Sequence, residues 1–223
     1  MSQTKATPTP SMPAAETMLL REAYEAAGVI LEYGSGGSTR LASRMPDKYI
    51  LSIESDVVWA RQLRQQIAQE GPLSPVTVYH VDIGPTGAWG RPCDESHWRS
   101  YHRYPNAIWD EPFFRHPDVV LIDGRFRLAC LMSVILHTTR PVRVLFDDYA
   151  DRPKYHRAER ILRPERMVGR MAEFLVRPGV ARSRDIGYMI AQFFDTTIHT
   201  GGKISYDIPA GERLALLSGS LEK

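Results

Sequence analysis

An acidic residue follows each of five short apolar runs in this 223-residue sequence. These acids are Glu32, Glu54, Asp82, Asp123 and the pair Asp147 and Asp148. If the runs are parallel strands, their carboxyl ends meet at one edge of a sheet, where open α/β folds bind ligands. An acid at one strand end can simply cap the next helix. Acids at all five ends, beside the glycine-rich loop described next, favour a binding site.

A glycine-rich loop follows the first of these acids and consists of Gly34, Ser35, Gly36, Gly37 and Ser38. Glycines allow a backbone to turn sharply and to approach a ligand closely. The dinucleotide fingerprint G-x-G-x-x-G is a rival interpretation, although its third glycine would fall on Thr39. Glu54 lies about as far downstream as the ribose-binding acid of that fingerprint, so spacing does not separate the two.

Three other features favour an adenosyl sulfonium over a dinucleotide. The carboxylate of Glu32 would repel a pyrophosphate and would suit a cationic amino acid group. Asp82 suits the exocyclic amine of an adenine. The sequence also has no second glycine-rich βαβ unit that could hold a nicotinamide.

The segment from Glu32 to Ser38 resembles motif I, E/D-x-G-x-G-x-G, of the class I S-adenosylmethionine-dependent methyltransferases, with serine in place of the last glycine. The resemblance extends over residues 29–162. It implies that the loop wraps the methionine part of S-adenosylmethionine and that Glu54 accepts hydrogen bonds from the ribose hydroxyls. It also implies that Asp82 lies beside the adenine and Asp123 beside the reactive methyl group.

Within that superfamily, L-I-D-G at 121–124 and F-D-D-Y at 146–149 resemble the metal-assisted O-methyltransferases, including the macrocin type. In those enzymes, acids after the fourth and fifth strands hold a magnesium ion, which prefers hard oxygen ligands. Here Arg125 and Phe126 replace the acidic residue and the histidine that often follow the Asp-Gly pair. Because an arginine would repel the ion, magnesium is conceivable but not favoured, and we predict no metal ligand.

The predicted catalytic residues are Asp123, Arg125, Asp147 and Asp148. Any of the three acids could remove the proton of a hydroxyl acceptor, and three histidines, His97, His102 and His156, are further candidate bases. Arg125 and Arg127 could pair with an anionic small molecule or sugar acid. Alternatively, both arginines are solvated in the first turn of a helix.

These residues can meet at one edge of a sheet only if strands and helices alternate along the chain. Strands are expected at 29–31, 49–53, 76–81, 119–122 and 142–146, and helices at 13–27, 37–44, 56–69, 127–137 and 155–162. Such alternation predicts an α/β fold: a Rossmann-like, doubly wound, mainly parallel sheet with helices on both faces.

The predicted organisation is a disordered leader at 1–11, one domain at 12–200 and a tail at 201–223. An aromatic-rich insertion at 84–117 is interpreted either as a lid or as a short helix that caps the core. The segment 185–195 is interpreted as a helix or a closing strand.

Composition restricts the partners and the compartment. A formal net charge of +2 requires neither nucleic acid nor an anionic membrane as partner. No apolar run approaches the roughly 18 residues of a membrane span. Cys93 and Cys130 lack zinc-ligand spacing. Two cysteines also make no disulfide framework, which fits a reduced cytoplasm. The aromatic insertion is compatible with a homodimer interface.

The sequence therefore predicts a methyltransferase that uses S-adenosylmethionine, acts on a small-molecule acceptor and methylates oxygen. Two alternatives stay open: a nicotinamide-dependent oxidoreductase, and a methyltransferase-like protein that binds the cofactor without turnover.

Overall fold

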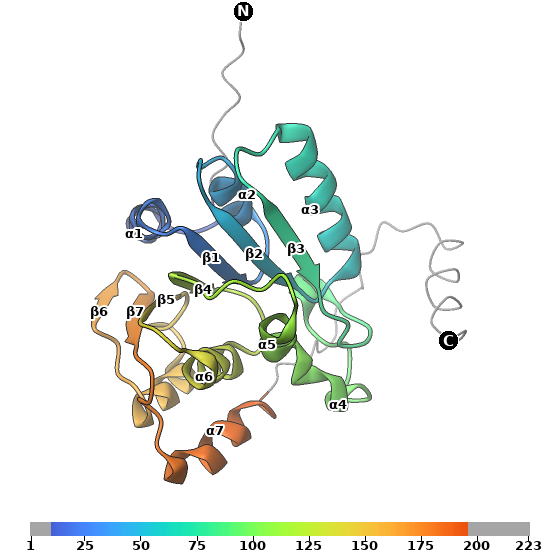
Figure 1. Cartoon of the computed structure of the whole chain (residues 1–223). Coiled ribbons are helices and arrows are strands. Elements are labelled where there is room, and N and C mark those ends of the chain that lie inside the picture. The colour runs from blue at the N-terminus through green and yellow to red at the C-terminus, as the bar shows by residue number, and fades with distance from the viewer. Residues whose placement is uncertain (1–9, 196–223) are drawn as a thin grey trace, which may run out of the picture.

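A central seven-stranded sheet has the strand order β3-β2-β1-β4-β5-β7-β6 (Figure 1). It is seen in a computed structural model that describes residues 10–195. The strands are β1 (Val29–Tyr33), β2 (Tyr49–Glu54), β3 (Val76–His80), β4 (Val119–Ile122), β5 (Val142–Phe146), β6 (Arg166–Val168) and β7 (Met171–Val176). The first five strands are parallel, whereas β7 is antiparallel to both β5 and β6. The predicted mainly parallel α/β fold is confirmed.

Helices pack on both faces of this sheet (Figure 1). They are α1 (Ala14–Ala26), α2 (Gly37–Ser43), α3 (Val57–Glu70), α4 (Trp98–Tyr101), α5 (Arg103–Asn106), α6 (Arg127–His137) and α7 (Ile186–Gln192). Within residues 10–195, four 3₁₀ helices join them: η1 (Ala88–Gly90), η2 (Ala107–Asp110), η3 (Pro153–Arg160) and η4 (Ser183–Asp185). Alternate residues of β1 serve the two faces: Ile30 packs in the cluster that contains α1 and α2, and Leu31 packs with α6.

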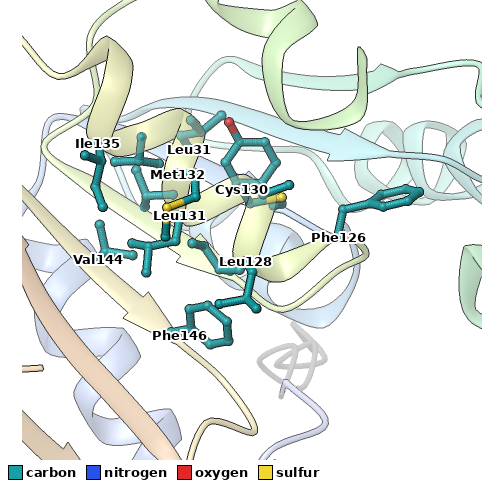
Figure 2. Packing of buried hydrophobic residues seen from close by; sticks show 14 of the residues in the cluster. Leu31, Phe126, Leu128, Cys130, Leu131, Met132, Ile135, Val144 and Phe146 are labelled. Atoms are coloured by element: carbon teal, nitrogen blue, oxygen red, sulfur yellow. The ribbon is translucent and has the colours of Figure 1, made fainter. Parts of the chain in front are cut away.

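Helix α6 fills the space beside β4 and β5 and is buried on nearly every side from Arg127 to Ile135. Figure 2 shows its leucines and Met132 beside Val144 and Phe146 of β5. A helix that is apolar all round must be covered all round, and α5 and α7 also pack against it. This packing fixes the turn between β4 and α6, which carries several predicted site residues.

The sequence placed the first five strands within two residues of their observed ends but missed β6 and β7. The segment predicted as a helix at 155–162 is instead the 3₁₀ helix η3. Segment 185–195 contains helix α7 and no strand.

The insertion at 84–117 forms η1, α4, α5 and η2, and it buries Tyr101 and Tyr104 in the core. The predicted tail and most of the predicted leader lie outside the described residues. Across residues 10–195, every helix is too short or too polar to cross a membrane.

Candidate active site

A cavity of about 740 Å³ lies at the carboxyl edge of the parallel strands. The residues that line it come from the ends of four strands and from several other segments. They include the loop 34–38 after β1, Glu54 after β2, Asp123 to Arg125 after β4, Asp147 and Asp148 after β5, residues 89–91 and residues 10–12. The cavity thus brings together all the predicted site residues except Glu32 and Asp82.

Glu54 presents a buried carboxylate at the cavity wall. One of its oxygens accepts a hydrogen bond from Ser35 Oγ at 2.9 Å, and the other accepts from the backbone N–H groups of Ser55 and Asp56 at 2.8 and 2.9 Å. Burial raises the pKa of Glu54, and these hydrogen bonds oppose the rise. The backbone therefore fixes an acceptor group where the sequence predicts a ribose.

The glycines of the loop after β1 serve two different purposes. Gly34 has a φ of +100°, and a Cβ there would lie 2.6 Å from the backbone of Gly124 in the loop after β4. At Gly36, by contrast, the nearest atom to an added Cβ is a Trp59 ring carbon at 4.0 Å. Gly34 is therefore required by loop packing, whereas the loop is open at Gly36, on the cavity lining.

Glu32 lies behind the loop and does not line the cavity. Its side chain points to the α1 and α2 face of the sheet, where Tyr24 Oη donates to it at 2.6 Å and Ser52 Oγ at 2.9 Å. Thr39 Oγ1 donates a further hydrogen bond, and Thr39 Oγ1 also accepts from the Gly36 N–H at 2.9 Å. We correct the predicted direct contact accordingly: Glu32 supports the loop from behind.

Asp82 is also displaced from its predicted place. It is exposed and accepts a hydrogen bond from the Gly84 N–H at 2.9 Å. The wall beside Glu54 comes instead from Trp89, Gly90 and Arg91 of the insertion.

Gly90 fastens the insertion to the end of β2. The residue has a φ of +66°, and an added Cβ would lie 2.6 Å from Ser55 Oγ. Ser55 Oγ donates to the Gly90 carbonyl at 2.9 Å. The insertion therefore both caps the core, through its buried tyrosines, and lines the cavity. The sequence did not distinguish the residues that have these two roles.

Arginines surround the acids at the ends of β4 and β5. Carboxylate oxygens of Asp123, Asp147 and Asp148 lie within 4.8 Å of one another. Arg127 of α6, which is buried, reaches Asp123 Oδ1 and Asp148 Oδ2, each at 3.0 Å. Arg170, in the turn between β6 and β7, binds both oxygens of Asp147 at 3.0 and 2.9 Å.

Further ion pairs complete this cluster. Arg170 Nε lies 3.2 Å from Asp148 Oδ1, and Arg152 lies 2.9 Å from Asp148 Oδ2. The three carboxylates therefore already have three guanidinium partners. A divalent cation among them would meet strong repulsion, so the residues present do not fit a bound metal. From the sequence, Arg125 was expected to repel a metal ion. The arginines that pair with the three aspartates are instead Arg127, Arg152 and Arg170.

The acids of this cluster differ in acidity. Burial and the neighbouring charges of Asp147 and Asp148 raise the pKa of Asp123 to about 7, although Arg127 acts in the opposite direction. The pKa of Asp147 is lowered, because the hydrogen bonds and charge of Arg170 outweigh its burial. Asp123 is therefore the member of this pair that can exchange a proton near neutral pH.

The three candidate histidines do not join this site. His97, His102 and His156 are exposed and do not line the cavity. The cavity is also lined by Asp56, Trp59, Arg152 and Arg170, to which no motif of the sequence pointed.

Comparison with known proteins finds matches among solved structures only. No family model and no curated protein match the sequence. Among solved structures, a methyltransferase-like protein from Silicibacter pomeroyi is 46% identical, with a TM-score of 0.80, over 84% of this chain and 98% of that one.

Two more distant structures were also found. One is a methyltransferase from Geobacter sulfurreducens, with 12% identity, a TM-score of 0.48 and coverage of 75% and 82% of the two chains. The other is the O-methyltransferase TomG from Streptomyces achromogenes in complex with SAM, with 19% identity, a TM-score of 0.49 and coverage of 77% and 82%.

Proposed function

Because the chain belongs to the class I S-adenosylmethionine-dependent methyltransferase superfamily, we propose that it transfers a methyl group from S-adenosylmethionine to a hydroxyl group of a small molecule. The observation that carries this proposal is a carboxylate whose pKa is about 7, that of Asp123, in a cavity at the carboxyl edge of the sheet.

The cavity suits the proposed cofactor. The open face of the loop at Gly36 and the fixed carboxylate of Glu54 would hold its amino acid and ribose parts. Bound there, S-adenosylmethionine would supply an electrophilic methyl group and a neutral thioether as leaving group. The protein must then supply alignment and a dry surrounding, which are the main requirements of such a displacement.

Asp123 is the proposed general base. Its side chain is 37% exposed toward the cavity, so an acceptor hydroxyl can reach it, and Arg127 holds one of its oxygens at 3.0 Å. A base works best when its pKa lies near the working pH. Asp147 stays ionised beside Arg170 and serves as fixed negative charge rather than as the base.

Calorimetric titration tests the proposal directly. S-adenosylmethionine and its demethylated product should bind, and NAD⁺ should not. Glu54→Gln should weaken binding by about 10- to 100-fold, the equivalent of the roughly 1.5–3 kcal/mol of a hydrogen bond to a charged group. Glu165→Gln, at an exposed surface pair with Arg177, is the matched control.

Either of two outcomes would contradict the proposal and favour an alternative function. Binding of NAD⁺ in place of S-adenosylmethionine would indicate the oxidoreductase alternative. Cofactor binding without methyl transfer to any component of a cell extract, followed with labelled cofactor, would indicate a protein that binds without turnover.

A further inference from the structure

A smaller cavity of about 140 Å³ adjoins the main one. The two share five lining residues, Arg91, Gly124, Arg125, Arg127 and Arg152. Lys154 and Tyr155 of η3 line its other side. A cavity of this size holds only part of a small molecule, since whole-ligand pockets typically measure about 300–1,000 Å³. The smaller cavity therefore suits a single functional group of a larger ligand.

Two arginines in the shared wall lack the partners that the others have. Arg127 and Arg152 are paired with aspartates. Among residues 10–195, by contrast, neither Arg91 nor Arg125 forms an ion pair with a carboxylate, and the buried Nε of each has no hydrogen-bond acceptor. Buried polar groups almost always have partners, and an exception calls for a ligand or a functional reason.

The backbone holds Arg125 in place at some cost. The following residue, Phe126, has a φ of +51°, which is unfavourable for a non-glycine side chain. Cys130 Sγ donates to the Arg125 carbonyl at 3.3 Å, and the ring of Phe126 packs on Tyr101 and Tyr104. The fold therefore fixes the backbone of Arg125 beside the cavity, while no carboxylate among residues 10–195 pairs with its guanidinium.

The local charge is strongly positive at this wall. Burial and the charges of Arg127 and Arg91 lower the pKa of Arg125. Asp195 is the only acid among the described residues that line the smaller cavity, and it is paired with Arg157. An anionic group would relieve this repulsion and would satisfy the free N–H groups.

We propose that Arg91 and Arg125 bind an oxyanion, a carboxylate or phosphate, carried by the methyl acceptor. Arg127 lines both cavities and contacts Asp123, so an acceptor anchored in the smaller cavity would present its hydroxyl to the base in the larger one. This proposal rests on the proposed function and specifies its substrate class: a hydroxylated small molecule with one anionic group.

The test measures binding of simple probes at constant ionic strength. The probes are inorganic phosphate, 4-hydroxybenzoate and the uncharged 4-hydroxybenzamide, each titrated with and without the demethylated cofactor. At least one anion should bind more tightly than the amide. Arg125→Met and Arg91→Met should each weaken that binding at least tenfold, and Arg99→Met, at the exposed surface beside Trp98, should not.

The conservative variant Arg125→Lys separates the two anions. It should keep a larger share of phosphate binding than of carboxylate binding, because only arginine pairs bidentately with a carboxylate. This variant keeps the charge, so it also covers the case in which Arg125→Met fails to fold.

The proposal would be overturned if neither phosphate nor the benzoate binds more tightly than the benzamide, or if anion binding is unchanged in both methionine variants. An anion that binds to a protein that does not bind the cofactor would refute the proposed function and leave the oxyanion site standing. Cofactor binding without anion binding would refute the oxyanion site and leave the proposed function standing.

Discussion

The ionisation of Asp123 should control the rate of methyl transfer. Because its pKa is about 7, the carboxylate form is lost as the pH falls through 7. We expect kcat/KM for the acceptor to fall about tenfold for each pH unit well below 7 and to level off above 8. A pH series from 5.5 to 9 with saturating cofactor measures this.

The matched variant is Asp123→Asn. It should lose about 10²- to 10⁴-fold in rate and show no transition near pH 7, while it still binds the cofactor. A profile with the same transition in the variant would remove Asp123 from the role of base.

Arg170 should contribute to stability through Asp147. The Asp147 side chain is only 2% exposed, and removing its partner in Arg170→Met leaves a buried charge, which should lower the free energy of unfolding by about 3 kcal/mol at pH 7. Urea denaturation measures this. Arg177→Met, at the exposed pair with Glu165, should change stability by less than about 1 kcal/mol.

The same variant gives a signature in pH. Arg170 lowers the pKa of Asp147 in the folded state, so its contribution is present above the unfolded pKa of about 3.9 and is lost as the pH falls through the folded pKa. The difference between wild type and Arg170→Met should shrink at the acid end. A constant difference from pH 7 to pH 2 would mean that Arg170 acts through packing alone.

The arginine partners also predict metal-independent activity. Since Arg127, Arg152 and Arg170 already neutralise Asp123, Asp147 and Asp148, a chelator should leave the rate unchanged and Mn²⁺ should show no tight binding by electron paramagnetic resonance. Loss of activity in EDTA that is restored by Mg²⁺ would contradict this.

The sequence located the acids of the site better than it located their partners. Glu54 and Asp123 come directly after apolar runs, so their place at the strand ends could be predicted. Arg170 comes from a distant turn, and Trp89 and Arg91 from a segment without periodicity, so only the tertiary fold shows them. The role of Glu32 depends on Tyr24 of α1. The sequence predicted this helix but not where it packs against the sheet.

At the scale of elements, the five parallel strands were predictable because helices cover both faces and the strands are apolar throughout. Strand β7 was missed because Glu173 interrupts its apolar run. The carboxylate of that residue is satisfied by Arg143 at 2.6 Å and by Arg166. A usable signal existed in Gly169 and Arg170, which form the two-residue connection between β6 and β7.

The contact between the loops after β1 and β4 gives a prediction at this scale. In Gly124→Ala, the new Cβ would lie 2.3 Å from Tyr104 Oη and 2.7 Å from the Gly34 nitrogen. We expect this overpacking to lower the free energy of unfolding by about 1–3 kcal/mol, as measured by urea denaturation. Gly187→Ala, in α7 with no atom within 4 Å, should be neutral or stabilising by up to about 1 kcal/mol.

For the whole molecule, the strand order explains why the cavity lies where it does. The chain runs outward from β1 to β3 and then returns to β4 beside β1, so connections leave this point in opposite directions and a crevice opens between them. The touching loops at Gly34 and Gly124 form the floor of that crevice.

Ligand binding should therefore protect separate parts of the chain together. With saturating demethylated cofactor, we expect slower amide hydrogen exchange at 34–38, 54–56 and 89–91, because all three line the cavity. The edge strand β6 is the internal control and should not change. Global stability should rise by about 2.7 kcal/mol when the ligand is at 100 times its Kd. Protection confined to one segment would contradict a shared site.

The residues just before α1, Pro10 to Met12, form part of the cavity wall. We therefore expect a change to this segment, such as its deletion, to alter ligand binding in the cavity. The segment ahead of the first helix is thus part of the binding site, and an N-terminal truncation that is meant to be neutral should end before Pro10.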